Sequence, residues 1–156
     1  MTPISEVANI LDLDQILDQT CGLARTVGEI QKANLRRKNL GVVTKSSVVD
    51  LVTEVDHYSE QYLITALHHA YPDHAILSEE QGQQIGYSEY LWVIDPLDGT
   101  TNYSQGLPIF SISIALQYRG QSIMGVVYAP IMDQMFTAIQ GKGAFLNGKP
   151  IAVAQK

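Results

Sequence analysis

The sequence has one cysteine, Cys21, and one tryptophan, Trp92, in 156 residues. A lone cysteine excludes an internal disulfide and fits a reducing compartment. No apolar run approaches the ~18 residues that a membrane-spanning helix needs, and the first residues lack the basic and apolar regions of a signal peptide. We therefore expect a cytoplasmic protein with no membrane partner.

Basic residues are also scarce. Ten Lys and Arg face 16 Asp and Glu, which gives a net charge of −6 and a pI near 5.0. This balance argues against nonspecific nucleic-acid binding, so we expect no nucleic-acid partner.

What the sequence does contain is typical of a globular protein. Hydrophobic residues make up 46% and charged residues 17% of the chain, which is inconsistent with disorder. The length favours one domain. There is no internal repeat and no low-complexity tract.

The stretch around Asp95 and Asp98 is the centre of the sequence. The apolar run Leu91–Ile94 predicts a buried strand, and Pro96 predicts its end. The segment 98–101 resembles a helix start, with Asp98 as the cap. Carboxylates hold a hard cation and a helix N-terminus holds an anion. We therefore expect a site for a metal-bound phosphate; the alternative is a capped turn in which both aspartates bond only local backbone.

Two helices are expected before this stretch. The first begins at Asp12, with Gln15 completing a capping-box pattern, and ends near Lys38. The segment 42–53 predicts a strand or an extended hairpin, and a second capping box at 53–56 opens the second helix, which ends at 71–73. Residues 1–11 are either a first turn or a loose tail. Four histidines on or after the second helix are expected at the surface: His57, His68, His69 and His74. The alternative is a zinc site, which the adjacent His68 and His69 disfavour because neighbouring side chains diverge on a helix.

Strands dominate the rest of the chain. A short strand at 75–78 delivers Glu79 and Glu80, and residues 81–90 form a polar connection. The alternating pattern of 110–116 predicts a half-buried strand. Further strands are expected at 123–128, 134–138 and 144–146, and Asn147-Gly148 predicts a tight hairpin. The order predicts an α/β protein of the α+β type, with helices on one face of a largely antiparallel sheet.

The segment 95–103 closely resembles the signature of the inositol monophosphatase family, the lithium-sensitive, magnesium-dependent phosphatases. The resemblance runs from about Asp12 to Val153. It extends to Lys45-Ser46-Ser47, Asp50-Leu51-Val52-Thr53 with Asp56, Ser78-Glu79-Glu80, Gly125-Val126-Val127-Tyr128 and Gly141-Lys142-Gly143-Ala144-Phe145. The resemblance implies a layered α-β-α-β-α sandwich related to fructose bisphosphatase. Residues 1–156 would be the amino-terminal half of that domain.

The resemblance implies a site with two or three Mg²⁺ ions, for which Mn²⁺ substitutes. Glu79, Asp95 and the backbone carbonyl of Leu97 would hold one ion. Asp95 and Asp98 would share the second, and Glu79 would reach a third through water. Glu80 would lie next to these ligands without binding a metal ion itself. The family commonly has Gly where this chain has Ser78, and a small residue still fits there.

Catalytic roles follow from the same resemblance. Thr100 would position the attacking water together with Asp56, and Glu79 would take part in catalysis. The substrate phosphate would be bound at Asp98, by the amides of Gly99, Thr100 and Thr101, and near Lys45. For Lys45 the alternative is an ordinary surface lysine.

The chain also departs from the family. Family members run well beyond this length and carry a Trp-Asp motif, which is absent here. We therefore expect an amino-terminal half, whether an expressed piece, a sequencing fragment or a truncated gene product. That half would lack a cover on one sheet face and would self-associate; family members are often homodimers.

The function expected from the resemblance is a Mg²⁺-dependent phosphomonoesterase that hydrolyses inositol monophosphate, incomplete as a 156-residue chain. Its partner would be a small phosphorylated substrate. Related substrates stay open: fructose-1,6-bisphosphate, 3′-phosphoadenosine nucleotides and histidinol phosphate. A non-catalytic module that binds metal or a protein partner is the other alternative.

Overall fold

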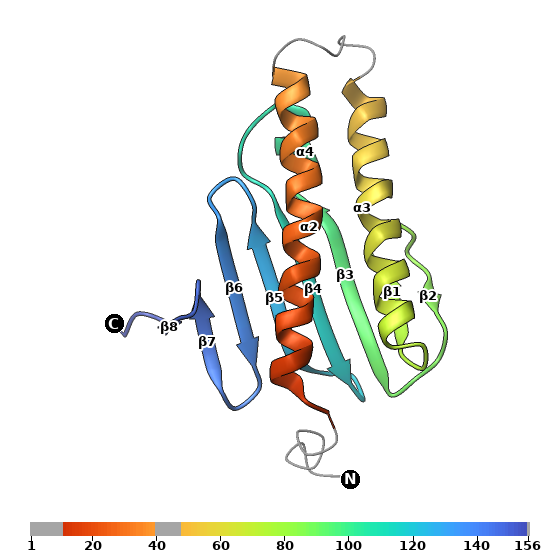
Figure 1. Ribbon diagram of the computed structural model, residues 1–156, viewed down its shortest axis with the longest axis vertical. Helices are drawn as coiled ribbons and strands as arrows, with labels where there is room; N and C mark the ends of the chain where they lie inside the picture. The colour runs from red at the N-terminus through yellow and green to blue at the C-terminus, as the bar shows by residue number, and fades with distance from the viewer. Residues whose placement is uncertain (1–10, 40–47, 156) are drawn as a thin grey trace.

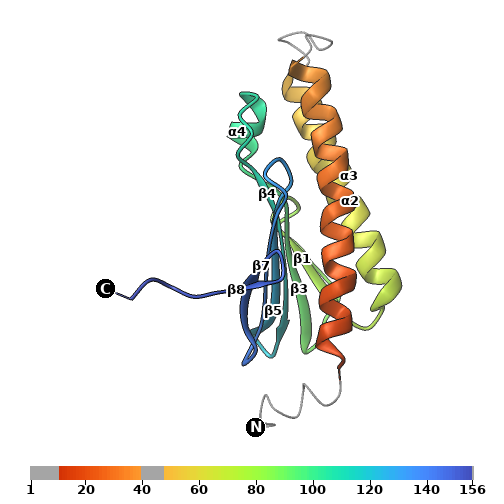
Figure 2. The same cartoon turned by 60° about the vertical axis from the view of Figure 1, so that its left-hand side comes forward.

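The computed structural model describes residues 11–39 and 48–155. Two long helices, α2 (Leu13–Asn39) and α3 (Val48–Ala70), lie side by side over one face of an eight-stranded sheet (Figures 1 and 2). None of the described helices is both long and apolar enough to cross a membrane. Helices on one face of a mostly antiparallel sheet confirm the predicted α+β class.

The sheet follows the order β2-β1-β3-β4-β5-β6-β7-β8. The strands are β1 (Ala75–Ser78), β2 (Gln84–Ile85), β3 (Tyr90–Asp98), β4 (Ser111–Tyr118), β5 (Gln121–Ala129), β6 (Gln134–Ile139), β7 (Gly143–Leu146) and β8 (Lys149–Ile151). Only β1 and β3 pair in parallel; every other described pair is antiparallel. The carboxyl ends of β1 and β3 therefore meet at one edge of the sheet.

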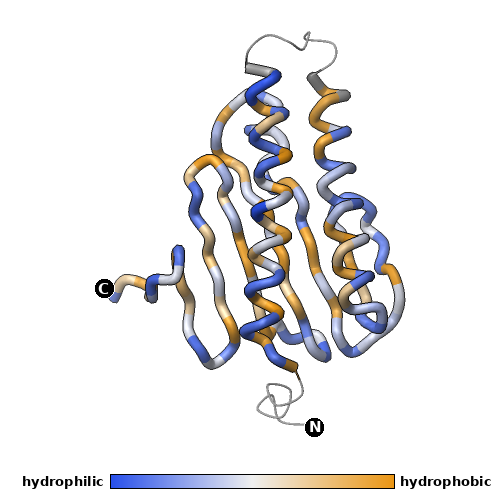
Figure 3. The backbone as a smooth tube through the Cα atoms, viewed as in Figure 1, coloured by the Kyte–Doolittle hydropathy of each residue, from blue (hydrophilic) through white to orange (hydrophobic). Residues whose placement is uncertain are grey.

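The main core lies between the two helices and the sheet. Alternate residues of β4, Ile112, Ile114 and Leu116, are buried toward the helices, as the period-2 pattern predicts. Ala24 and Val27 of α2 are fully buried in the same cluster. Seen from the helix side, α2 carries many hydrophilic residues (Figure 3). The helix therefore separates an apolar face against the sheet from a polar outer face.

The start of α2 agrees with the sequence. The Gln15 N–H donates to Asp12 Oδ1 at 3.0 Å, so Asp12 caps the helix as predicted. The hairpin at Asn147-Gly148 is also confirmed. Both residues have positive φ, 48° and 78°, as a type I′ turn requires.

The predicted strand at 42–53 is wrong for residues 48–53, because α3 already begins at Val48; residues 42–47 lie outside the described part. Thr53 is inside the helix, where its hydroxyl donates to the Val49 carbonyl at 2.9 Å, so it does not cap the helix. Leu51 and Val55 bury one face of this turn in a second core cluster. That packing overrides the β propensity of the valines and threonine.

Pro96 does not end the central strand, which continues to Asp98. The register of β3 against β4 shifts between Asp95 and Asp98, so a bulge accommodates the proline. The predicted cap at Asp98 is also wrong. The next helix, α4 (Thr100–Ser104), follows Gly99, which has a φ of 95°, and the helix has no side-chain cap.

Aromatic residues gather at the other end of β3. The His74 ring stacks between Tyr71 and Tyr90, and Trp92 Nε1 donates to His74 Nδ1 at 3.1 Å. His74 is half-buried, so its predicted place at the surface is wrong.

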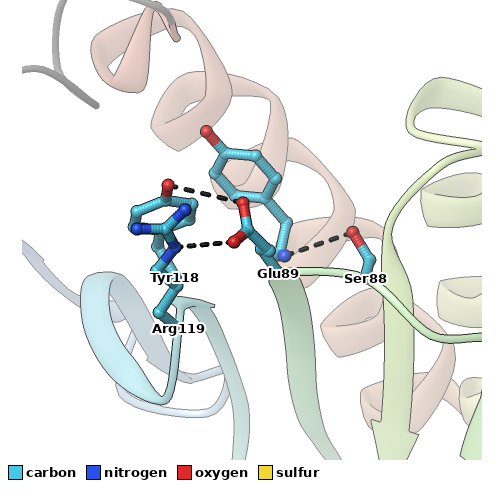
Figure 4. A network of polar contacts seen from close by, with 5 residues as sticks. Ser88, Glu89, Tyr118 and Arg119 are labelled. Carbon is cyan, nitrogen blue, oxygen red and sulfur yellow. Dashed lines mark hydrogen bonds and ion pairs between the residues drawn. The ribbon is translucent and has the colours of Figure 1, made fainter. Parts of the chain in front are cut away.

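A polar network closes this end of the sheet (Figure 4). The Glu89 carboxylate accepts hydrogen bonds from the Arg119 Nε–H at 2.7 Å and from the Tyr118 hydroxyl at 3.5 Å. The network ties the start of β3 to the end of β4.

Candidate active site

A pocket of about 220 Å³ lies where α3, β1 and β3 meet. Its lining consists of Asp56, Glu79, Glu80, Asp95, Pro96, Leu97, Asp98, Gly99 and Thr100. Segments far apart in the sequence therefore contribute to one concave site. A concave site with convergent polar groups is a first candidate for ligand binding.

The sheet topology brings these residues together. Because β1 and β3 are parallel neighbours, Glu79 and Glu80 leave the sheet at the same edge as Asp95. The Glu79 N–H donates to the Ile94 carbonyl at 3.1 Å, which fixes the first glutamate beside the strand. The bulge then turns Leu97 inward, with 2% of its surface exposed, and Asp98 outward.

Asp56 lies on α3, and few contacts compensate for the burial of its carboxylate. It is 6% exposed, and its Oδ1 has no hydrogen-bond partner among the described residues. Burial, with Glu80, Glu60 and Glu79 adding repulsion, raises the pKa of Asp56 to about 7. A buried carboxylate without a partner is costly, so this position favours a bound cation.

Asp95 is in a similar state. Burial, a hydrogen bond with the Glu79 side chain and the nearby charge of Asp98 raise the pKa of Asp95 to about 7. Two carboxyl groups in hydrogen-bond contact cannot both be ionised unless something positive lies between them. The raised pKa of Asp95 means that a proton relieves this repulsion as the pH falls through about 7, and a divalent cation would replace that proton.

The donor chemistry fits Mg²⁺ or Mn²⁺, because the pocket offers only oxygen ligands. Its lining includes five carboxylates and no Lys or Arg from the described residues. The geometry is not preformed: across residues 11–39 and 48–155, no three Asp, Glu, His or Cys side chains are already placed to hold a metal ion. The residues thus fit a cation by charge and donor type, and binding would require the carboxylates to rearrange.

Most of the predicted site residues line this pocket. Glu79, Asp95, Leu97 and Asp98 do so as expected of metal ligands, and their ligand roles stay predictions. Asp56, Gly99 and Thr100 also line it. Thr101 is exposed on α4 and is not part of the lining. Lys45 lies outside the described residues.

Three buried polar residues near the site had no predicted role: Gln31, Glu60 and Ser78, each at most 1% exposed. Each has a side-chain oxygen without a partner among the described residues. For Gln31 a signal was present, because it follows Val27 at helical spacing on the inner face of α2. Glu60 likewise lies four residues after Asp56. A polar residue at an inward position is the pattern that would have identified both.

Comparison with known proteins agrees with the fold. The model of the inositol monophosphatase family matches residues 12–156. The chain is 46% identical to Nus factor SuhB of Pseudomonas aeruginosa over 84% of this chain and 49% of that protein. It is 40% identical to inositol monophosphatase 3 of Solanum lycopersicum over 92% and 54%. The solved inositol monophosphatase of Anabaena superposes with a TM-score of 0.78 at 35% identity, over 94% of this chain and 52% of that one.

The fold and the pocket together define the class of protein. It is an α+β domain with an acidic pocket at the carboxyl ends of two parallel strands. The chain belongs to the inositol monophosphatase family. It spans about half the length of the curated relatives that it matches.

Proposed function

We propose that this chain carries the metal-binding part of a Mg²⁺-dependent phosphomonoesterase acting on inositol monophosphate. One observation supports this most strongly: five carboxylates converge on a small pocket whose described lining has no basic residue. Family membership supports phosphatase chemistry. Inositol monophosphate is proposed because inositol monophosphatases are among the relatives.

Divalent ions at such a site would supply an activated water, charge relief on the phosphoryl oxygens and help for the leaving oxygen. The ligands proposed for them are Glu79, Asp95, Asp98 and the Leu97 carbonyl. The bound ions would neutralise the charge of these carboxylates enough for the pocket to admit an anionic substrate.

The remaining residues would orient the reactants. The Thr100 hydroxyl can accept a proton from the attacking water while donating to a carboxylate, and Asp56 is the carboxylate proposed. The backbone amides of Gly99 and Thr100 would bind phosphate oxygens. Because α4 has only five residues, these individual amides, rather than a helix dipole, would provide the attraction.

A second function is favoured by the relatives themselves, because several of them carry the name Nus factor. In this alternative the chain acts through a partner macromolecule instead of through hydrolysis. One variant would distinguish the two functions. Asp95→Asn would abolish phosphatase activity but leave a partner-binding role intact.

The test is phosphate release from inositol 1-phosphate by the purified chain, with and without Mg²⁺. A full-length relative and its equivalent aspartate-to-asparagine variant are assayed beside it. We expect Mg²⁺-dependent hydrolysis that Asp95→Asn abolishes, at a rate well below that of the full-length relative. Fructose-1,6-bisphosphate and a 3′-phosphoadenosine nucleotide serve as competing substrates.

Two results would contradict the proposal. Hydrolysis that is indifferent to Mg²⁺ and to Asp95→Asn would remove the site from the reaction. A faster reaction with one of the competing substrates would replace the proposed substrate while keeping the site.

A further inference from the structure

Gln31 is a polar residue in the core, fully buried on the sheet-facing side of α2. Its Nε2 donates to the Pro96 carbonyl at 2.7 Å and to Ser59 Oγ at 3.3 Å. Because a carbonyl only accepts hydrogen bonds, the amide nitrogen must face Pro96. The Ser59 hydroxyl donates in turn to the Val55 carbonyl at 2.7 Å, so it is left to accept from Gln31.

A second hydrogen bond joins Gln31 to the far side of the turn that follows Pro96. The Tyr103 hydroxyl donates to the Gln31 backbone carbonyl at 2.7 Å. Pro96 lies within the bulge between Asp95 and Asp98, and Tyr103 lies within α4. One residue of α2 therefore contacts both flanks of the segment 97–102, which includes Leu97, Asp98 and the amides proposed to bind phosphate.

We propose that Gln31 is a positioning residue for this turn, and the inference rests on the function proposed above. Its amide fixes the plane of the Pro96–Leu97 peptide at the point where the ladder register shifts. That plane sets the direction in which the Leu97 carbonyl and Asp98 leave the strand. A turn free to rotate here would present its metal ligands in several arrangements, and ordering them would weaken binding.

Gln31 does not serve stability well, which separates positioning from simple packing. Its Oε1 is buried without a partner among the described residues. Removing the unpaired Oε1 should gain stability, whereas the Pro96 carbonyl that loses its donor should cost stability. Gln31→Leu should therefore lower the urea midpoint only by the difference between these two effects while loosening the turn.

The hydrogen bond from Gln31 to the Pro96 carbonyl can be monitored directly, because Pro96-Leu97 is the only Pro-Leu dipeptide in the sequence. A chain labelled with ¹³C-carbonyl proline and ¹⁵N-leucine gives one signal in a carbonyl–amide NMR correlation. We expect Gln31→Leu to move the Pro96 carbonyl signal. Thr20→Val is the matched control, since Thr20 is a buried polar residue of the same helix whose hydroxyl, among the described residues, bonds only its own helix, at the Ile16 carbonyl. It should leave the signal unchanged.

The consequence for the site is measured by Mn²⁺ titration of the same three proteins. Gln31→Leu should weaken Mn²⁺ binding by about fivefold to tenfold, the effect of one hydrogen bond. Thr20→Val should bind Mn²⁺ as the wild type does. A Pro96 signal that stays in place in Gln31→Leu, or an unchanged Mn²⁺ affinity, would overturn the proposal. A wild-type chain that binds no Mn²⁺ would overturn the proposed function and the metal role of Gln31, while the Pro96 signal still decides whether Gln31 holds the turn.

Discussion

Individual buried polar residues separate this molecule from an ordinary two-layer domain. Asp56 and Glu60 lie one helical turn apart on the inner face of α3, both almost fully buried. Each has an oxygen with no partner among the described residues. Natural cores avoid such groups because they are destabilising. We interpret their presence beside the pocket as stability given up for cation binding.

His74 provides a residue-scale prediction that is independent of the metal. Its Nδ1 accepts from the Trp92 indole, so the ring is neutral in the folded chain. Burial lowers the pKa of His74, although the charge of Asp73 opposes this. The folded state therefore binds this proton less readily than the unfolded state. The stability that the neutral His74 ring contributes is fully present above the ordinary histidine pKa of about 6.5. It is lost as the pH drops toward the lower pKa of the folded state.

The expected result is a urea midpoint that declines between pH 7.5 and 5 more steeply in the wild type than in His74→Asn, where the asparagine oxygen replaces Nδ1 as the acceptor. The fluorescence of Trp92, the only tryptophan, reports unfolding in both proteins. Carboxylates titrate in the two chains alike, so the difference isolates His74. Parallel pH profiles would show that the His74–Trp92 bond has no effect on stability.

At the scale of elements, β3 organises the molecule. It starts in the aromatic cluster, runs through the middle of the sheet and ends in the acidic bulge. One strand therefore links the aromatic cluster to the candidate site.

The sequence predicted this strand and its acidic end because both depend on local patterns: an apolar run followed by D-P-L-D-G-T-T-N. It did not predict that the strand passes through Pro96, because a bulge depends on pairing with β4. It also missed the early start of α3, where burial of Leu51 and Val55 outweighs local propensity. The contact between Gln31 and Pro96 spans 65 residues, and no local pattern indicates its partner.

The packing of α2 on the sheet gives a prediction at the same scale. A Cβ at Gly28 would lie 2.7 Å from the Tyr128 ring and 2.9 Å from Pro130. Gly28→Ala should therefore destabilise the fold by about 1–3 kcal/mol through overpacking. Gly22, on the exposed side of the same helix, has nothing within 4 Å of its Cβ position. Gly22→Ala should stabilise by about 0.5–1 kcal/mol through helix propensity.

Urea denaturation of the two variants checks this pair. The sign difference is the critical outcome, because both substitutions add the same methyl group to one helix. If Gly28→Ala proved as stable as Gly22→Ala, α2 would not pack against β5 as closely as described.

For the molecule as a whole, the two faces of the sheet differ. Both long helices cover one face, and no described helix covers the other (Figure 2). That open face has a hollow of about 500 Å³ across β4 to β8. Its residues on β4 and β5 are small or apolar, including Ser113, Ala115 and Val127. An open apolar surface of this kind favours association.

We expect the chain to self-associate through this face, as the sequence predicts. Sedimentation velocity at increasing concentration measures it directly. Val127 is 39% exposed at the centre of the face, and Val127→Lys should shift the population toward monomer without unfolding the chain. If the wild type sediments as a compact monomer at tens of micromolar, the face is self-sufficient and this expectation is wrong.

The pocket at the ends of β1 and β3 is proposed to hold a divalent cation through Asp95 and Glu79. The most direct measurement is Mn²⁺ titration of the wild type, Asp95→Asn and Asp18→Asn. Asp18 is an exposed residue of α2, so the control variant loses the same charge far from the pocket. We predict weak binding by the wild type and the control, and a loss of more than about tenfold in Asp95→Asn, since ligand and supporting residues each contribute about that much or more. Equal Mn²⁺ affinity in all three proteins would contradict the claim.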